Sequence, residues 1–195
     1  MSSKKIPEIE TKRLLLRQVT SADLDAWAER VFADPEVVRF MPKRDMTPLQ
    51  RAERAFNNYN RFWEERGIGG WVITDKKNGE FIGSIEIEYL DDTDEYELGY
   101  CMRKDYWGRG ISTEAARAVV RFGFENANLN RIMAVVVPEN TASWKVLEHV
   151  GLVYEKNARY YDLDVVYYAI TRDQYKADNS FYRMLALGSS YRLSH

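Results

Sequence analysis

Two glycines stand where the sequence changes from a strand pattern to a helix pattern. Gly108 and Gly110 follow a predicted strand and precede a helix expected from about Ser112. Glycine allows a ligand to approach the backbone closely, and the first N–H groups of a helix point toward whatever lies in front of them. Positive charge is close by in the sequence, on Arg103, Lys104 and Arg109. The segment predicts a phosphate or pyrophosphate site, although many strand–helix turns contain two glycines for structural reasons alone.

Two familiar phosphate-binding motifs do not fit this turn. The third glycine of the dinucleotide-binding fingerprint falls at Thr113, and the turn lies in mid-chain rather than after the first strand. The P-loop pattern also fails, because no Gly-Lys-Ser/Thr follows at the required spacing.

An acidic stretch comes just before the glycine turn. Its members are Glu86, Glu88, Asp91, Asp92, Asp94, Glu95 and Glu97. Such a cluster can attract a cationic substrate, or it can be the solvated end of a hairpin. Strand alternation puts Glu97, Gly99 and Cys101 on one face. No histidine is spaced to pair with Cys101, so we expect a small buried side chain there and not a nucleophile.

Hydrophobic spacing and turn residues predict mixed α/β structure with helical crossovers around a largely antiparallel sheet. Strands are expected over 14–19, 71–74, 81–89, 95–103, 132–137, 152–159 and 161–170. Helices are expected from 21 and over 49–66, 112–126 and 141–149, with a loop at 34–48 and a partly helical tail beyond 171.

Composition excludes several classes of protein. The 195 residues predict one domain, and a net charge of −2 disfavours a nucleic-acid-binding module. One cysteine rules out an intramolecular disulfide, and two histidines disfavour a closed zinc site. The longest apolar run, 132–137, is too short to span a membrane, and the first ten residues lack a hydrophobic signal core. We therefore expect a cytoplasmic protein without membrane or direct nucleic-acid contacts.

Three separated segments carry a resemblance to a known family. They are ETKRLLLR at 10–17, YELGY at 96–100 with YWGRG at 106–110, and NRI at 130–132 with PENTAS at 138–143 and GLVYE at 151–155. In order and spacing they resemble the GNAT superfamily of acyl-CoA-dependent N-acyltransferases, and within it the Rim-type ribosomal-protein N-terminal acetyltransferases. The likeness covers about 10–170 of a single domain over 1–195 and leaves 171–195 as a C-terminal extension. It implies a GNAT-like α/β fold, with a central, splayed, mostly antiparallel sheet flanked by helices.

The resemblance implies acetyl-CoA as co-substrate and no metal. Main-chain atoms of Gly99, Tyr100 and Met102 are expected at a strand bulge beside the pantetheine arm, which Asn140 also holds. The implied pyrophosphate contacts are Trp107, Gly108, Arg109, Gly110, Ile111 and Ser112. Alternatively, Gly99 packs under an aromatic ring and Asn140 is a helix N-cap. Asp105 departs from the family, which has Gln or Arg there; an acid suits this place only if it points away or pairs with Arg103 or Arg109.

For catalysis the resemblance implies Glu97 as general base, acting through water on the attacking amine. Glu86 and Glu88 are rival bases, and Glu97 can equally be a solvent-facing strand residue. Ser143 matches the Rim-type position that protonates the departing thiolate; Tyr154 is the tyrosine alternative, with packing as its other role.

The implied activity is transfer of an acetyl group to a primary amine, of a protein N-terminus, a lysine or a small molecule, by direct attack in a ternary complex. The alternative is a CoA-binding protein without catalysis that acts as a sensor or interaction module. The extension carries an apolar cluster that needs cover, from the sheet edge or from a second copy in a homodimer. Its members are Phe181, Tyr182, Met184, Leu185 and Leu187.

Overall fold

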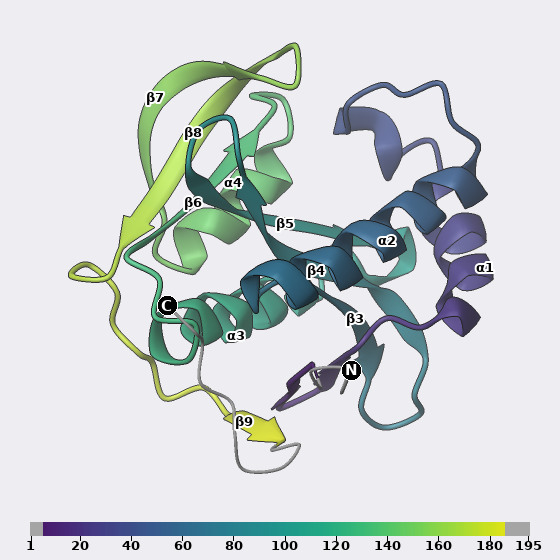
Figure 1. The fold of residues 1–195 in the computed structure, drawn as a ribbon, viewed down its shortest axis with the longest axis horizontal. Coiled ribbons are helices and arrows are strands. Elements are labelled where there is room, and N and C mark those ends of the chain that lie inside the picture. Colours follow the sequence, from purple (N-terminus) through teal and green to yellow (C-terminus); the bar gives the residue numbers. More distant parts are fainter. Residues whose placement is uncertain (1–5, 186–195) are drawn as a thin grey trace.

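One curved sheet runs through residues 6–185, the part of the chain that the computed structural model describes (Figure 1). The strand order is β7-β8-β6-β5-β4-β3-β2-β1-β9, and every neighbouring pair is antiparallel except β5–β6. The strands are β1 (Glu8–Thr11), β2 (Leu14–Arg17), β3 (Gly70–Asp75), β4 (Phe81–Leu90), β5 (Glu95–Met102), β6 (Arg131–Val136), β7 (Val153–Tyr160), β8 (Leu163–Thr171) and β9 (Tyr182–Leu185). The predicted mixed, mostly antiparallel fold is confirmed.

Helices cover this sheet. They are η1 (Ser21–Asp23), α1 (Leu24–Trp27), η2 (Ala28–Phe32), η3 (Val38–Phe40), α2 (Pro48–Arg66), η4 (Lys104–Tyr106), α3 (Ile111–Glu125) and α4 (Thr141–His149). Figure 1 shows α4 and the β7–β8 hairpin at one end of the molecule and α1 at the other. None of the helices in the described chain is long and apolar enough to cross a membrane.

The two largest of three buried clusters in the described residues fix the layers. The larger one contains most of α3, with Ile85, Ile87 and Leu98 from the central strands. The smaller one joins α1 and α2 to the sheet through Trp27 and Tyr59. Alternate residues of β4 and β5 therefore face different layers, and the acids of these strands lie on the side of α2.

The N-terminal strand differs from its prediction, because the chain folds there into a hairpin. Strands β1 and β2 pair antiparallel, with Ile9 opposite Leu16. The turn is fixed by Thr11, whose hydroxyl accepts the Leu14 N–H at 3.0 Å. Apolar side chains on both strands are buried. The strand predicted over 14–19 is therefore only the second strand of a two-strand hairpin.

The predicted helical character of the tail is wrong for its described part, where β9 pairs with β1 instead. Tyr182 and Met184 pack partly buried against the main core. The unpaired edge of β1 is satisfied in this way, as an edge strand requires. The expected packing on the sheet edge is thus confirmed for Tyr182–Leu185, whereas Leu187 lies outside the described residues.

Candidate active site

The sheet opens between β5 and β6. These two parallel strands pair at one position, Glu97 opposite Met133. On its other side β5 pairs with β4 in regular register from Gly83–Met102 to Leu90–Glu95. The bulge expected near Gly99 is therefore absent from the β4–β5 ladder, and the sheet splays on the β6 side alone.

A carboxyl group explains the glycine at position 99. A Cβ added to Gly99 would lie 2.4 Å from Glu86 Oε1, which belongs to the residue opposite it on β4. Glycine is needed here because the Glu86 side chain approaches the backbone closely. Gly99 thus packs under a neighbouring side chain, as one of the two alternatives predicted, but that side chain is an acid and not an aromatic ring.

Glu86, Glu88 and Glu97 form an acidic cluster on the side of the sheet that faces α2. Glu88 lies opposite Glu97 on the neighbouring strand. Burial is the main cause that raises the pKa of Glu86 to about 8 and that of Glu97 to about 7, and it also raises the pKa of Glu88. Like charges within the cluster add to the effect for Glu86 and Glu97. These carboxyl groups are thus half-buried proton acceptors rather than the solvated end of a hairpin.

Two tyrosines donate hydrogen bonds to the acidic cluster. The Tyr161 hydroxyl donates to Glu97 from the β7–β8 turn, where Tyr161 and Asp162 both have positive φ. The backbone of Val135 on β6 lies close enough to the Glu97 carboxylate to lower its pKa. The Tyr59 hydroxyl on α2 donates to Glu86 and lies 3.3 Å from Ser84 Oγ. Sequence reasoning missed both tyrosines, because nothing in their spacing links them to strands so far away.

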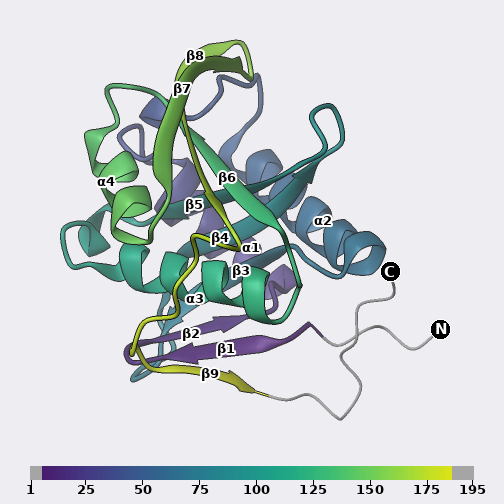
Figure 2. The same ribbon diagram turned by 90° about the vertical axis from the view of Figure 1, so that its left-hand side faces the viewer.

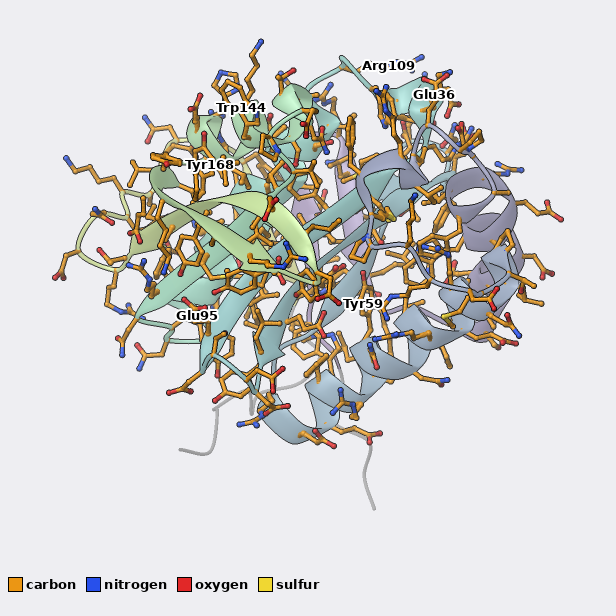
Figure 3. All side chains as sticks on the ribbon, turned by 90° about the horizontal axis from the view of Figure 1, so that it is seen from above. Glu36, Tyr59, Glu95, Arg109, Trp144 and Tyr168 are labelled. Atoms are coloured by element: carbon orange, nitrogen blue, oxygen red, sulfur yellow. The ribbon has the colours of Figure 1, made fainter. Side chains whose placement is uncertain are left out.

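The ring of Tyr59 is tightly enclosed. A Cβ on Gly70 of β3 would lie 2.1 Å from Tyr59 Cδ2, and the ring centroid of Trp27 is 5.4 Å from that of Tyr59. Tyr59 is buried, and Figure 3 shows it near the middle of the molecule's outline as seen from above. Because Gly70 has no side chain, the Tyr59 ring has room to reach the carboxylate of Glu86 on β4.

The glycine turn adopts the backbone that its composition predicts. Gly108 and Gly110 have φ of 70° and 71°, a left-handed conformation that suits glycine. Gly110 is the N-cap of α3 and provides no side-chain cap, so the N–H groups at the start of α3 remain available for an anion. Ile111 is buried and Ser112 half-buried at this start. The Trp107 indole donates to the Met102 carbonyl at 3.0 Å, which holds the turn against the end of β5.

The charges around the turn are arranged differently from the expectation. Arg103 binds Asp105, with Nη2–Oδ2 at 2.6 Å, and also Glu80, while Lys104 binds Glu36. Two of the three expected cations are therefore already paired with acids. The negative charge of Asp105 is paired with Arg103, so it meets the condition under which an acid suits this position. The guanidinium carbon of Arg109 lies 5.2 Å from the centroid of the Tyr106 ring, and no carboxylate of the described chain forms an ion pair with it.

Residues at the N-terminal hairpin hold the start of α3, a role that the sequence did not indicate. Glu114 accepts hydrogen bonds from the Thr11 hydroxyl and from the N–H and Nε of Arg13 at 2.6–2.8 Å. Arg13 Nη1 donates to the Arg109 carbonyl at 2.8 Å. The glycine turn is thus braced from a segment about a hundred residues earlier.

We expect Glu114→Ala to lower the free energy of unfolding by about 1–3 kcal/mol, because the buried Thr11 hydroxyl and the exposed Arg13 both lose a charged acceptor. Urea unfolding measures the change. Glu65→Ala is the matched control, since its pair with Arg61, 3.6 Å apart, is exposed and contributes about 0.5 kcal/mol or less. Equal losses in the two variants would show that Glu114 is no brace.

Asn140 and Ser143 lie at the start of α4, close to β5. Asn140 is the N-cap, and its side chain accepts the Ser143 N–H at 3.3 Å, so the capping interpretation is confirmed. The Tyr100 hydroxyl lies 2.9 Å from both Ser143 Oγ and the Ser143 carbonyl oxygen. Burial raises the pKa of Tyr100 to about 12, so this phenol is protonated at neutral pH. Tyr100 and Ser143 form a hydroxyl pair on the other side of β5 from the acidic cluster.

The remaining candidates do not join this arrangement. Tyr154 is half-exposed on β7, where its hydroxyl donates to Asn157 at 3.2 Å and its ring packs edge-on to Tyr168. Burial raises the pKa of the Cys101 thiol to about 11, and its polar neighbour is Ser84, with Oγ 3.3 Å from Sγ, which does not suit a nucleophile. Within residues 6–185 no group of His, Cys, Asp and Glu side chains has the arrangement of a metal site.

Comparison with known proteins gives consistent matches. A family model described as "Acetyltransferase (GNAT) domain" matches residues 13–153. The uncharacterized N-acetyltransferase p20 of Bacillus licheniformis is 30% identical over 172 residues, covering 85% of this chain and 96% of that protein. The putative ribosomal N-acetyltransferase YdaF of Bacillus subtilis (strain 168) is 31% identical over 119 residues, or 57% of this chain and 63% of that protein.

Among solved structures, that of the acetyltransferase from Agrobacterium tumefaciens str. C58 superimposes with a TM-score of 0.76 at 30% identity. The match covers 85% of this chain and 95% of that chain. The region matched by the family model includes the acidic cluster, the glycine turn and the hydroxyl pair.

Proposed function

Because the chain belongs to the GNAT acetyltransferase family, we propose that it transfers the acetyl group of acetyl-CoA directly to a primary amine in a ternary complex. Relatives are named as N-acetyltransferases, so the enzyme class is N-acetyl transfer. The acceptor is an amine of a protein N-terminus or of a small molecule; the similarity to YdaF, a putative ribosomal N-acetyltransferase, favours the protein amine. The observation that carries the proposal is the opening of the sheet between β5 and β6 beside the half-buried acidic cluster.

Acetyl-CoA supplies the activated acetyl group, and the chain supplies its cradle. The uncapped start of α3, from Trp107 to Ser112, suits the pyrophosphate, since free N–H groups and the helix dipole favour an anion. Arg109 supplies a positive charge for the pyrophosphate, whereas Arg103 and Lys104 are already paired with acids. Main-chain atoms of Gly99, Tyr100 and Met102 border the opening between the strands and are assigned to the pantetheine arm, and the Asn140 amide N–H₂ group is left free by capping for the same arm.

Glu97 is assigned as the general base. A primary amine is protonated at neutral pH and must lose a proton to attack the acetyl carbonyl. A carboxyl group whose pKa lies near 7 both accepts and releases protons in that range. Glu97 is also the residue at which β5 and β6 part, so its carboxyl group lies beside the opening. Glu86 is more deeply enclosed by Tyr59, and its role is to support the cluster.

We assign protonation of the departing thiolate to Ser143, with Tyr100 as its hydrogen-bonded partner. Ser143→Ala is expected to lower kcat about 100-fold with little change in the Kd of acetyl-CoA, because a proton donor is lost and no binding contact. Thiol release gives kcat, and calorimetry gives Kd. A kcat like that of the wild type would exclude Ser143 as the acid. Tyr100→Phe, which keeps the serine hydroxyl, tests the partner separately.

Two measurements test the function as a whole. Calorimetric titration with acetyl-CoA is expected to show binding at one site per chain, and a chain that does not bind it would refute the proposal. Thiol release over a panel of peptide and small amines is then expected to show turnover with at least one acceptor. Binding without turnover on any amine would instead identify a sensor.

A further inference from the structure

Three arginines gather beside the acidic cluster without an acid partner of their own. Arg44 precedes α2, and Arg51 and Arg54 lie one turn apart on the same side of that helix. Arg51 Nη2 donates to the Arg44 carbonyl at 3.1 Å, which ties the loop to the helix. Within residues 6–185 no carboxylate oxygen lies within 4.0 Å of these guanidinium groups. Further along α2, by contrast, Arg61 pairs with Glu65 and Arg66 with Asp91. We call Arg44, Arg51 and Arg54 the arginine cluster.

The arginine cluster is close enough to the acidic cluster to interact with it. The positive charges of Arg54 and Arg44 lower the pKa of Glu88 against the larger effect of burial. Arg44 also interacts electrostatically with Tyr161, whose hydroxyl donates to Glu97. Figure 2 shows the loop before α2 rising beside the tip of the β7–β8 hairpin that carries Tyr161. The arginines therefore border the place where the amine must meet Glu97.

Glu88 interacts with Arg44 and Arg54, but no ion pair among the described residues neutralises the arginine cluster. Arg44 and Arg54 are exposed. Partial burial, followed by repulsion from Arg54 and Arg51, lowers the pKa of Arg44, so these like charges are close enough to repel one another. Burial also raises the pKa of Glu86 to about 8 and that of Glu97 to about 7, so neither carboxyl group is fully ionised near neutral pH. An anion bound here would relieve the repulsion, and guanidinium groups bind carboxylate and phosphate with paired hydrogen bonds.

We propose that the acceptor is a primary amine carrying a carboxylate or phosphate a few bonds from its nitrogen, with the arginine cluster holding the anion while the amine faces Glu97. This inference rests on the proposed function and narrows its acceptor class. It fits a free amino acid-like molecule or a peptide whose second residue is acidic. Polyamines are poor acceptors on this basis, because their second cation would lie against the arginines.

Acceptors matched in all but charge provide the test. Kinetics of thiol release are measured for 5-aminopentanoate and its amide, for the peptides Ala-Asp-Ala-amide and Ala-Asn-Ala-amide, and for spermidine. We expect the anionic member of at least one pair to have a kcat/KM about tenfold higher, mainly through a lower KM, since a charge-assisted pair is lost in the other member. Which pair responds distinguishes the small molecule from the peptide.

Variants then locate the effect. Arg54→Gln and the double variant Arg44→Gln/Arg54→Gln are expected to raise KM for the anionic acceptor about tenfold and to leave the neutral acceptor within about twofold. Arg66→Gln, on the same helix but paired with Asp91, is the matched control and should keep the preference. Equal kcat/KM for both members of each pair, a preference for spermidine, or a preference that survives in the double variant would overturn the inference alone. Absence of thiol release with every amine would instead overturn the proposed function.

Discussion

Glu97→Gln is expected to lower kcat/KM by about 10²–10⁴-fold at the pH optimum, because glutamine cannot accept the proton of the attacking amine. The wild-type pH profile is expected to rise with an apparent pKa near 7, where Glu97 ionises. This ascending limb should disappear in the variant and persist in Glu88→Gln. Steady-state rates from pH 5 to 9 provide the measurement. A limb kept in Glu97→Gln and lost in Glu86→Gln would assign the base to Glu86.

Tyr161 gives this assignment an independent check with a defined sign. Its hydrogen bond stabilises the ionised carboxylate and so lowers the pKa of Glu97 against the larger effect of burial. Tyr161→Phe should therefore move the ascending limb to higher pH, while the plateau reached at high pH changes less. A limb that moves to lower pH would contradict the role of Tyr161.

Gly70→Ala is expected to destabilise the protein by about 3 kcal/mol, because the added methyl group overpacks the core. The added methyl group would lie 2.1 Å from the ring of Tyr59, which Trp27 and the buried cluster around it prevent from moving. Activity should fall as well, since a displaced Tyr59 no longer holds Glu86. Urea unfolding and thiol release measure the two effects.

A double-mutant cycle isolates that clash. Tyr59→Ala alone leaves a cavity and is expected to cost about 3–5 kcal/mol. Adding Gly70→Ala to this variant should cost little more, because the methyl group then has room. Additive losses would mean that the ring and the glycine act independently.

Helices and strands were predicted well where hydrophobic spacing, capping residues and turn residues within the segment itself define them. Helix α2 was expected over 49–66 and runs from Pro48 to Arg66, because Thr47 caps its start and Gly67, with φ of 67°, ends it. The resemblance and strand alternation directed attention to Glu97 and Gly99 as neighbours on one face, and both border the opening of the sheet.

Contacts distant in sequence could not be predicted in the same way. The pairing of Lys104 with Glu36, and of Tyr100 with Ser143, depends on how the helices dock and leaves no periodic trace. The raised pKa values of Glu86 and Glu97 come from burial under α2 and the β7–β8 hairpin, which no single strand reveals. For the same reason the two-strand hairpin at 8–17 and β9 were missed: each is defined by its partner strand rather than by its own pattern.

The pairing of β9 with β1 brings the two ends of the described chain together, with Glu8 opposite Leu185. A linker between these strand ends spans about 5 Å, the distance between neighbouring strands, so closing it costs little chain entropy. The exposed β3–β4 turn at Lys77–Gly79 offers a place for new termini. A circularly permuted chain of this kind should retain the fold, since the joined strands β1 and β9 lie at an edge of the sheet, four and five strands away from β5.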